Sequence, residues 1–167
     1  MADKLQHIFE YRVLLSRARE LGIPLSDDEC ERLDLLGQEL PSGVPPIDDR
    51  DSHTVLNEPL AVEIVHAGRF QACTLRNAAS GGLALVTAVP PQLGQRVLVH
   101  VRSPKRPVEY TFPARVVSRV VRGVCGMSVA FEGLPSQRSL GGRTSGVFAT
   151  EDATPTEVHR HDGRRRR

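Results

Sequence analysis

Residues 96–101 read RVLVHV and residues 124–131 read VCGMSVAF. In the first stretch a valine occupies every second position, and in the second Met127, Val129 and Phe131 alternate with small residues. Side chains that alternate in this way point to opposite faces of an extended chain. Each stretch therefore predicts a β-strand with one apolar face.

Four more runs rich in β-branched and apolar residues lie between residues 60 and 121, separated by turn residues. The turns are Gly68, the sequence NAASGG at residues 77–82, and the Pro90–Pro91 pair. No helical pattern lies between the runs, so neighbouring strands should be antiparallel, and six short strands favour a closed barrel without exposed edges. The expected fold class is mainly β, a six-stranded antiparallel β-barrel. The predicted strands are residues 60–66, 70–76, 83–88, 96–101, 109–121 and 124–131.

Residues 1–40 carry a helical pattern instead, with two apolar stripes at three- and four-residue steps. Ser26 and Glu29 have the spacing of a capping box at the start of the second helix, and Pro41 ends that helix. Two short helices cannot bury their stripes alone, so this helical hairpin either caps the barrel or presents its apolar surface to another protein. The stripes are Leu5, Ile8, Tyr11, Leu15 and Ala18 in the first helix, and Cys30, Leu33, Leu36 and Leu40 in the second.

Composition divides the chain into four parts. The hairpin at 1–40 is followed by a linker at 41–54, PSGVPPIDDRDSHT, which is rich in proline and charge. The barrel is expected at 55–135. Residues 136–167 are polar and glycine-rich and end in HRHDGRRRR, so we expect a disordered tail that the fold does not need.

The net charge of +2 hides an asymmetry. Residues 1–51 hold 6 basic and 12 acidic residues, whereas residues 52–150 hold 11 basic and 4 acidic residues. An acidic hairpin thus precedes a basic barrel, and either the two parts lie against each other or each meets a different partner. No apolar run is long enough to span a membrane and no secretory signal is recognisable, so we expect a cytoplasmic protein without membrane insertion.

Nothing in the sequence predicts catalysis or a metal site. Cys30, Cys73 and Cys125 are widely spaced and form no CxxC pair, so we interpret them as buried small hydrophobic residues. Of the six histidines only His159 and His161 are close, and they lie in the polar tail. The barrel region holds only four carboxylates, too few for a paired general acid and base to be easily assembled.

The barrel region resembles a PilZ domain. Four stretches carry the resemblance in the family's order and spacing, and together they span about half the chain. No comparable resemblance covers the hairpin. The resemblance implies a small barrel that binds the second messenger cyclic di-GMP. The stretches are TLRNAASGGLALVT at 74–87, LGQRVLVHVRSP at 93–104, FPARVVSRVV at 112–121 and GMSVAFEGLP at 126–135.

The resemblance also implies two ligand motifs, and this sequence departs from both. The first, RxxxR before the first strand, would clamp phosphates with its guanidinium groups. The corresponding residues, HTVLNEPLAV at 53–62, contain no arginine, and four positions after Arg50 stands Thr54. Each charged hydrogen bond lost costs about 1.5–3 kcal/mol, so the two missing arginines should weaken the affinity by several orders of magnitude.

The second motif, [D/N]xSxxG after the second strand, is half present. Asn77 and Gly82 match it, but Ala79 stands at the serine position and Ser80 is its neighbour. Asn77, Ser80 and Gly82 would contact the ligand only if binding were retained. The alternative interpretation is a tight turn, in which Asn tolerates a left-handed conformation and Gly81 and Gly82 supply positive φ.

A basic surface would allow another function. Lys105, Arg106, Arg115 and Arg119 could form one patch for an anionic partner or for nucleic acid, with Arg164–Arg167 as a basic arm. Few aromatic residues are available to stack on bases, which disfavours nucleic acid. The four cations could equally be a solvated barrel exterior.

The sequence thus predicts a non-enzymatic regulatory adaptor that acts through protein–protein contacts and needs no cofactor. Cyclic di-GMP binding is expected to be weakened or lost, and the acidic hairpin is the candidate interaction surface. The resemblance implies a role in bacterial motility, pilus function or cell polarity. The alternative functions are a cyclic di-GMP receptor with atypical contacts and a nucleic-acid-binding small barrel.

Overall fold

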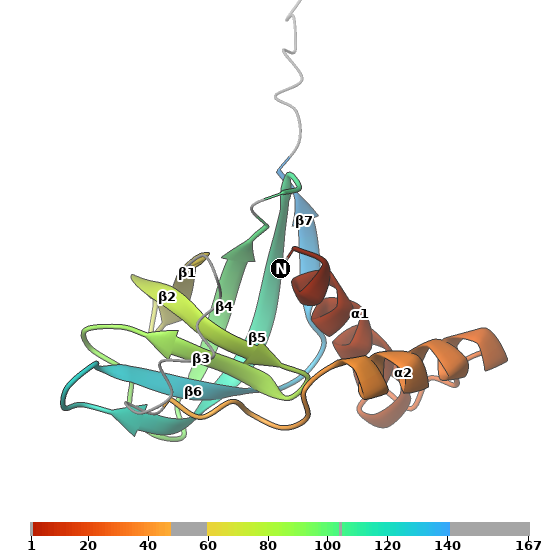
Figure 1. Ribbon diagram of the computed structural model, residues 1–167, viewed down its shortest axis with the longest axis horizontal. Coiled ribbons are helices and arrows are strands. Elements are labelled where there is room, and N and C mark those ends of the chain that lie inside the picture. The colour runs from red at the N-terminus through yellow and green to blue at the C-terminus, as the bar shows by residue number, and fades with distance from the viewer. Residues whose placement is uncertain (1, 48–59, 104, 141–167) are drawn as a thin grey trace, which may run out of the picture.

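The computed structural model describes residues 2–47, 60–103 and 105–140. It confirms a mainly β protein with a closed six-stranded antiparallel barrel, one outer strand and two N-terminal helices (Figure 1). The helices are α1 (Ala2–Arg19) and α2 (Asp27–Glu39). The strands are β1 (Leu60–His66), β2 (Arg69–Ala79), β3 (Gly82–Val86), β4 (Arg96–Arg102), β5 (Val108–Val120), β6 (Gly126–Phe131) and β7 (Ser136–Ser139).

The barrel closes because β4 pairs with both β1 and β5. The strands follow the order β4-β1-β2-β3-β6-β5 around the barrel, and every pairing is antiparallel. The long strand β5 pairs along one edge with β4, and along its other edge with β6 and then β7. All six predicted strands are therefore present, with ends that differ by a few residues.

Alternation places one face of each strand in the barrel core. Val97, Val99 and Val101 of β4 are buried, as the valine at every second position predicted, and they meet buried Phe112 and Tyr110 across the β4–β5 pair. A two-residue hairpin links β1 to β2 through residues with positive φ, Ala67 at 48° and Gly68 at 73°. Two consecutive positive φ values give the turn that matches strand twist.

The hairpin of helices caps the barrel core. Leu5 and Ile8 of α1 belong to the same buried cluster as the barrel interior, and Phe9 packs its ring 5.2 Å from Tyr110 and 6.4 Å from Phe112, between ring centroids. The sequence left open whether the apolar surface of the hairpin caps the barrel or contacts another protein. The buried contacts of Leu5 and Ile8 show that the apolar stripe of α1 packs on the barrel. Figure 1 shows both helices on one side of the barrel, with α1 beside β7.

The face of α1 that meets the barrel is more polar than the predicted stripe. Arg12 and Ser16 are buried, and the Ser16 hydroxyl donates to the Gly133 carbonyl over 3.0 Å, whereas Tyr11 is only partly buried. The Arg12 guanidinium lies 5.9 Å from the centre of the Phe131 ring. A pattern search for apolar residues could not find a docking face that continues through an arginine and a serine.

The second helix begins as its sequence predicts. The Ser26 hydroxyl accepts a hydrogen bond from the Glu29 backbone N–H, and the Glu29 carboxylate accepts from the Ser26 N–H, which completes the capping box. Leu36 and Leu40 are buried, and Leu33 is partly buried. The expectation for Cys30 was wrong, because its side chain is exposed on the outer side of α2. Cys73 is buried and Cys125 is intermediate.

The first residues of the predicted tail are ordered, which corrects the expectation of disorder from residue 136. Ser136–Ser139 form β7 and pair with Val108–Thr111 of β5, and Arg138 bonds to Glu109 over 3.0 Å. All four residues are exposed and polar, so hydrophobic periodicity gives no strand signal for them. Residues 141–167, including His159, His161 and Arg164–Arg167, lie outside the described residues.

Truncation should reveal the contribution of β7. We expect a chain that ends at Pro135 to be less stable than one that ends at Leu140 by about 1–2 kcal/mol, because it loses the β5–β7 hydrogen bonds and the Arg138–Glu109 ion pair. Thermal unfolding followed by circular dichroism should show this as a difference of several degrees in Tm. Equal Tm values for the two truncations would contradict the docking of β7.

Candidate functional site

The residues of the half-present motif surround the β2–β3 turn. Asn77 follows an irregularity in β2 and is partly buried, and its side-chain oxygen accepts a hydrogen bond from the Ala78 N–H over 2.8 Å. Ala79 and Ser80 are buried, and Gly82 opens β3. The structure therefore brings Asn77, Ser80 and Gly82 together at one end of a strand pair. The stretch that should carry RxxxR lies mostly outside the described residues.

Residues 41–47, PSGVPPI, which we call the strap, run from the end of α2 across this turn. The Ser80 N–H donates to the Pro41 carbonyl over 2.9 Å, and the Gly81 N–H donates to the Gly43 carbonyl over 3.0 Å. Farther along, the buried Ser128 hydroxyl donates to the Pro45 carbonyl over 2.8 Å. This part of the predicted linker thus packs on the barrel, as its course along β3 and β6 in Figure 1 shows.

Small residues on the outside of β3 and β6 make room for the strap. Gly82, Ala84, Gly126 and Ser128 alternate with core residues and so point outward, yet all four are buried. The strap covers part of this face, because a Cβ added at Gly82 would lie 3.0 Å from Val44 Cγ1, and one at Gly126 would lie 2.9 Å from Ile47 Cγ1. An outward face of small residues is a complementary surface for the strap.

Gly81 and Gly82 allow other backbone segments to approach closely, and their φ angles are not positive. This corrects the sequence interpretation, in which both glycines supplied positive φ. Among the described residues with positive φ, neither Gly81, Gly82 nor Asn77 appears. A Cβ at Gly81 would lie 2.6 Å from the Gly43 carbonyl oxygen, and one at Gly82 would lie 2.0 Å from the Val129 oxygen. Both distances are far inside van der Waals contact, so only glycine fits beside these backbones.

The predicted basic patch does not form as one surface. Lys105 and Arg106 lie in the loop before β5, whereas Arg119 lies near the far end of that 13-residue strand, where it donates to the Pro90 carbonyl over 3.1 Å. Arg115 is held by the Glu132 carboxylate through two nitrogens. The spacing of the four residues along an extended strand separates them, which the sequence reasoning overlooked.

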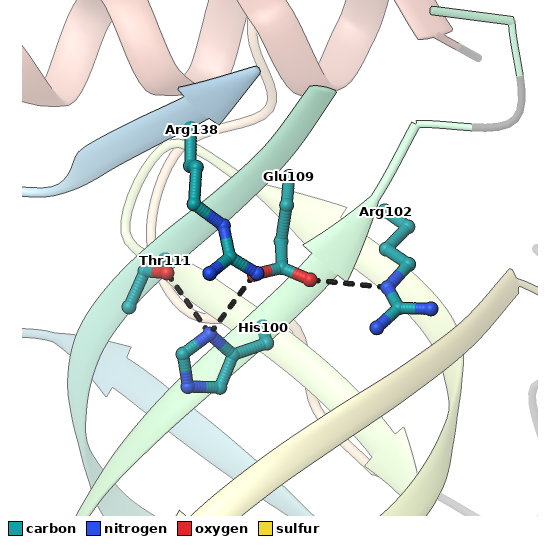
Figure 2. Close-up of polar contacts among 5 residues, drawn as sticks. All are labelled: His100, Arg102, Glu109, Thr111 and Arg138. Carbon is teal, nitrogen blue, oxygen red and sulfur yellow. Dashed lines mark hydrogen bonds and ion pairs between the residues drawn. The ribbon is translucent and has the colours of Figure 1, made fainter. Parts of the chain in front are cut away.

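A different charged cluster lies on the outer face of β4, β5 and β7. Figure 2 shows the Glu109 carboxylate between Arg102, which donates from Nε over 3.0 Å, and Arg138, which donates from Nη2 over 3.0 Å. His100 Nδ1 lies 3.8 Å from the same carboxylate and 2.9 Å from the Thr111 hydroxyl. The cluster therefore ties the polar strand β7 to the barrel wall.

Part of this cluster was visible in the sequence. Arg102 and Glu109 flank the loop between two predicted strands, and Arg102 pairs with Glu109 in the observed register. Opposite charges at directly paired positions are a recognisable cross-strand signal. Arg138 gave no such signal, because it belongs to the segment that was expected to be disordered.

The residues around Glu109 lower the pKa of its carboxyl group. Burial acts to raise the pKa of this carboxyl group, but the hydrogen bond from Arg102 and the positive charges of Arg138, His100 and Arg102 outweigh burial and hold the pKa below its ordinary value. The ionised carboxylate therefore contributes to stability at neutral pH. That contribution is lost as the pH falls through the lowered pKa of the folded state.

Among the described residues, two pockets on the barrel exterior stand out, and neither is lined by Asn77, Ser80 or Gly82. One of about 350 Å³ is lined by Val65, Leu98 and Pro113, together with the Arg96–Glu132 ion pair. The other, of about 210 Å³, adjoins the Glu109 cluster and includes Glu63. Within the described ranges, no group of three or more His, Cys, Asp or Glu side chains could hold a metal ion, and no helix is long and apolar enough to cross a membrane.

Two matched glycine substitutions should test the strap. We expect Gly81→Ala to destabilise the fold by about 1–3 kcal/mol, because its Cβ would meet the strap backbone. Gly37→Ala is the control: its Cβ would make an ordinary 3.5 Å contact with Tyr11, and alanine in a helix should stabilise by about 0.5–1 kcal/mol. Urea unfolding measures both changes, and equal effects of the two substitutions would argue against the tight strap–turn contact.

The Glu109 cluster should appear in the pH dependence of stability. At pH 7 we expect Glu109→Gln to lower the free energy of unfolding by about 1–2 kcal/mol, because two charge-assisted bonds weaken. The difference from the unmodified protein should begin to shrink below the ordinary carboxyl pKa of 4.5, where the unfolded chain becomes protonated at Glu109. It should be lost below the lowered pKa of the folded state. Glu63→Gln, at an exposed position on the same face, should be nearly neutral. A difference that stays constant down to pH 3 would contradict the assignment.

Comparison with known proteins identifies the family to which the barrel belongs. The family model described as the PilZ domain matches residues 49–141, more than half of the chain. No curated protein matches the chain. PilZ domains are generally non-enzymatic binding or adaptor domains with regulatory roles related to cyclic di-GMP, and they typically act with protein partners. With its closed six-stranded barrel and a family match that spans that barrel, the chain belongs to the PilZ domain family.

Proposed function

We propose that this protein is a non-enzymatic regulatory adaptor that acts through protein–protein contacts, and that its cyclic di-GMP binding is weakened or lost. The observation that carries the proposal is the strap at the β2–β3 turn. The backbone N–H groups of Ser80 and Gly81 donate to strap carbonyls, so they are not free to donate to a ligand. A ligand at this turn would have to break both bonds first.

The motif side chains add to this argument. The Asn77 amide oxygen already accepts from the Ala78 N–H, and Ala79 offers no hydroxyl where the family motif has serine. The two described pockets lie elsewhere on the barrel. Together with the missing RxxxR arginines, these features remove most of the groups that would anchor a dianionic nucleotide.

The hairpin remains the candidate surface for a protein partner, through α2 and not α1. The inner side of α2 is tied to α1 by the Arg32–Glu10 and Arg17–Glu29 ion pairs. Its outer side exposes four acidic residues, for which the described part of the chain shows no ion pair, beside Leu35, which is 46% exposed. An acidic surface around an apolar side chain suits a partner of opposite charge. The four acidic residues are Asp27, Asp28, Glu31 and Asp34.

The cellular setting of the proposal is bacterial motility, pilus function or cell polarity, in the cytoplasm. This setting rests on the family alone. The basic side chains offer less support for a nucleic-acid partner, because Arg115 is paired with Glu132 and Arg119 with a carbonyl.

A calorimetric titration tests the loss of ligand binding. We expect no saturable heat when the protein is titrated with cyclic di-GMP up to about 100 μM. Gly81→Ala, titrated in parallel, shows whether the strap contributes to the loss. A dissociation constant below about 10 μM for the unmodified protein, which is about 7 kcal/mol of binding free energy, would refute the proposal.

The adaptor role needs a cellular test. Asp34→Arg combined with Leu35→Glu should abolish complementation of a deletion strain without changing the melting temperature, because both side chains are exposed. An equivalent pair on the barrel, Glu63→Arg with Phe70→Glu, serves as the control. Full complementation by the α2 variant would exclude α2 as the contact surface.

A further inference from the structure

Basic side chains from separate parts of the chain gather at one end of the molecule. Arg102 ends β4, Lys105 and Arg106 lie in the loop between β4 and β5, and Arg138 lies in β7. We call these four residues the basic tip. Figure 1 shows this end of β5 and β7 projecting beyond the rest of the barrel, and the last described residue, Leu140, lies there too.

The positive charge of the basic tip is only partly neutralised. Glu109 is shared between Arg102 and Arg138, and the side chains of both arginines remain 71% exposed. Lys105 and Arg106 are exposed, and Arg106 also reaches the side chain of Gln6 in the first turns of α1. The tip thus holds four cations, and one carboxylate neutralises part of the charge of two of them. The amino end of α1 adds the positive end of a helix dipole close by.

The described pockets do not extend to the outermost cations of the basic tip. Arg102 lines the smaller pocket together with Glu109, whereas neither described pocket is lined by Lys105 or Arg106. The exposed apolar neighbours of Lys105 and Arg106 are Pro107 and Leu140, joined by a hydrogen bond from the Leu140 N–H to the Pro107 carbonyl. A projecting basic end with a little exposed apolar area complements an extended, negatively charged surface.

We propose that the basic tip docks peripherally on anionic lipid headgroups of a bilayer. Lysine and arginine side chains near such a surface each add to the attraction, and exposed apolar groups can enter the headgroup layer. The described part of the tip offers no exposed aromatic ring to stack on a base, since Phe70, the one large exposed aromatic, lies beside the β1–β2 turn. The chain continues from Leu140 into a sequence that ends in four arginines, which would strengthen the same attraction.

Vesicle cosedimentation of the full chain tests this assignment. Vesicles of phosphatidylcholine with about 30% phosphatidylglycerol should bind the protein at low salt, and binding should fall steeply at about 0.5 M NaCl. Vesicles of phosphatidylcholine alone should bind at least tenfold less. Lys105→Glu with Arg106→Glu should reduce binding to the anionic vesicles at least tenfold, while circular dichroism shows an unchanged fold.

A control variant with the same change in net charge tests whether the position of the basic residues matters. Arg19→Glu with Arg122→Glu changes the net charge by the same amount at exposed positions away from the tip, one at the far end of α1 and one beyond β5, and it should leave binding within about twofold. A chain that ends at Leu140 should keep its preference for anionic vesicles, although more weakly.

Four results would overturn the proposal. The first is equal binding to the two kinds of vesicle, and the second is equal loss in the tip and control variants. The third is complete loss of binding on truncation after Leu140, which would assign the attraction to the tail alone. The fourth is tighter, Lys105- and Arg106-dependent binding of a DNA or RNA duplex at the same ionic strength, which would assign the tip to nucleic acid.

Discussion

The packing of α1 against the interior of the barrel is the contact on which the rest of the arrangement depends. Leu5 and Ile8 complete the apolar core, and Phe9 joins the ring cluster of Tyr110 and Phe112. Each fully buried aliphatic side chain of this kind contributes about 1.5–3 kcal/mol. α1 is fixed on the barrel, and α2 is paired with α1. The chain therefore leaves α2 beside the β2–β3 turn, and the strap that follows α2 lies directly on that turn.

That path explains why the family's ligand region looks different in this protein. The small residues outside β3 and β6 and the glycines of the turn fit a backbone, and the strap supplies one. Motif residues that could have served a nucleotide are used in structural contacts instead. The contacts of this turn with the strap are therefore the basis of our proposal that ligand binding is weakened or lost.

Charge divides the molecule in a way that the net value of +2 conceals. The outer side of α2 is acidic, whereas the loop before β5 and strand β7 are basic. The buried Glu109 carboxylate sits among the cations of the basic end, where it orients Arg102 and Arg138 and attaches β7. Surfaces of opposite sign at separate positions allow one small protein to contact two partners, as the proposed adaptor role requires.

The sequence by itself determined the six barrel strands, the capping box of α2 and the family, because each depends on a local period or on spacing along the chain. Val97, Val99 and Val101 alternate whatever they pack against, and Ser26 meets Glu29 within one turn. Only the tertiary structure decided the strap, the polar part of the α1 docking face, β7 and the separation of Arg115 and Arg119 from Lys105 and Arg106. These features join residues far apart in sequence through backbone carbonyls and polar side chains, for which hydrophobic periodicity gives no signal.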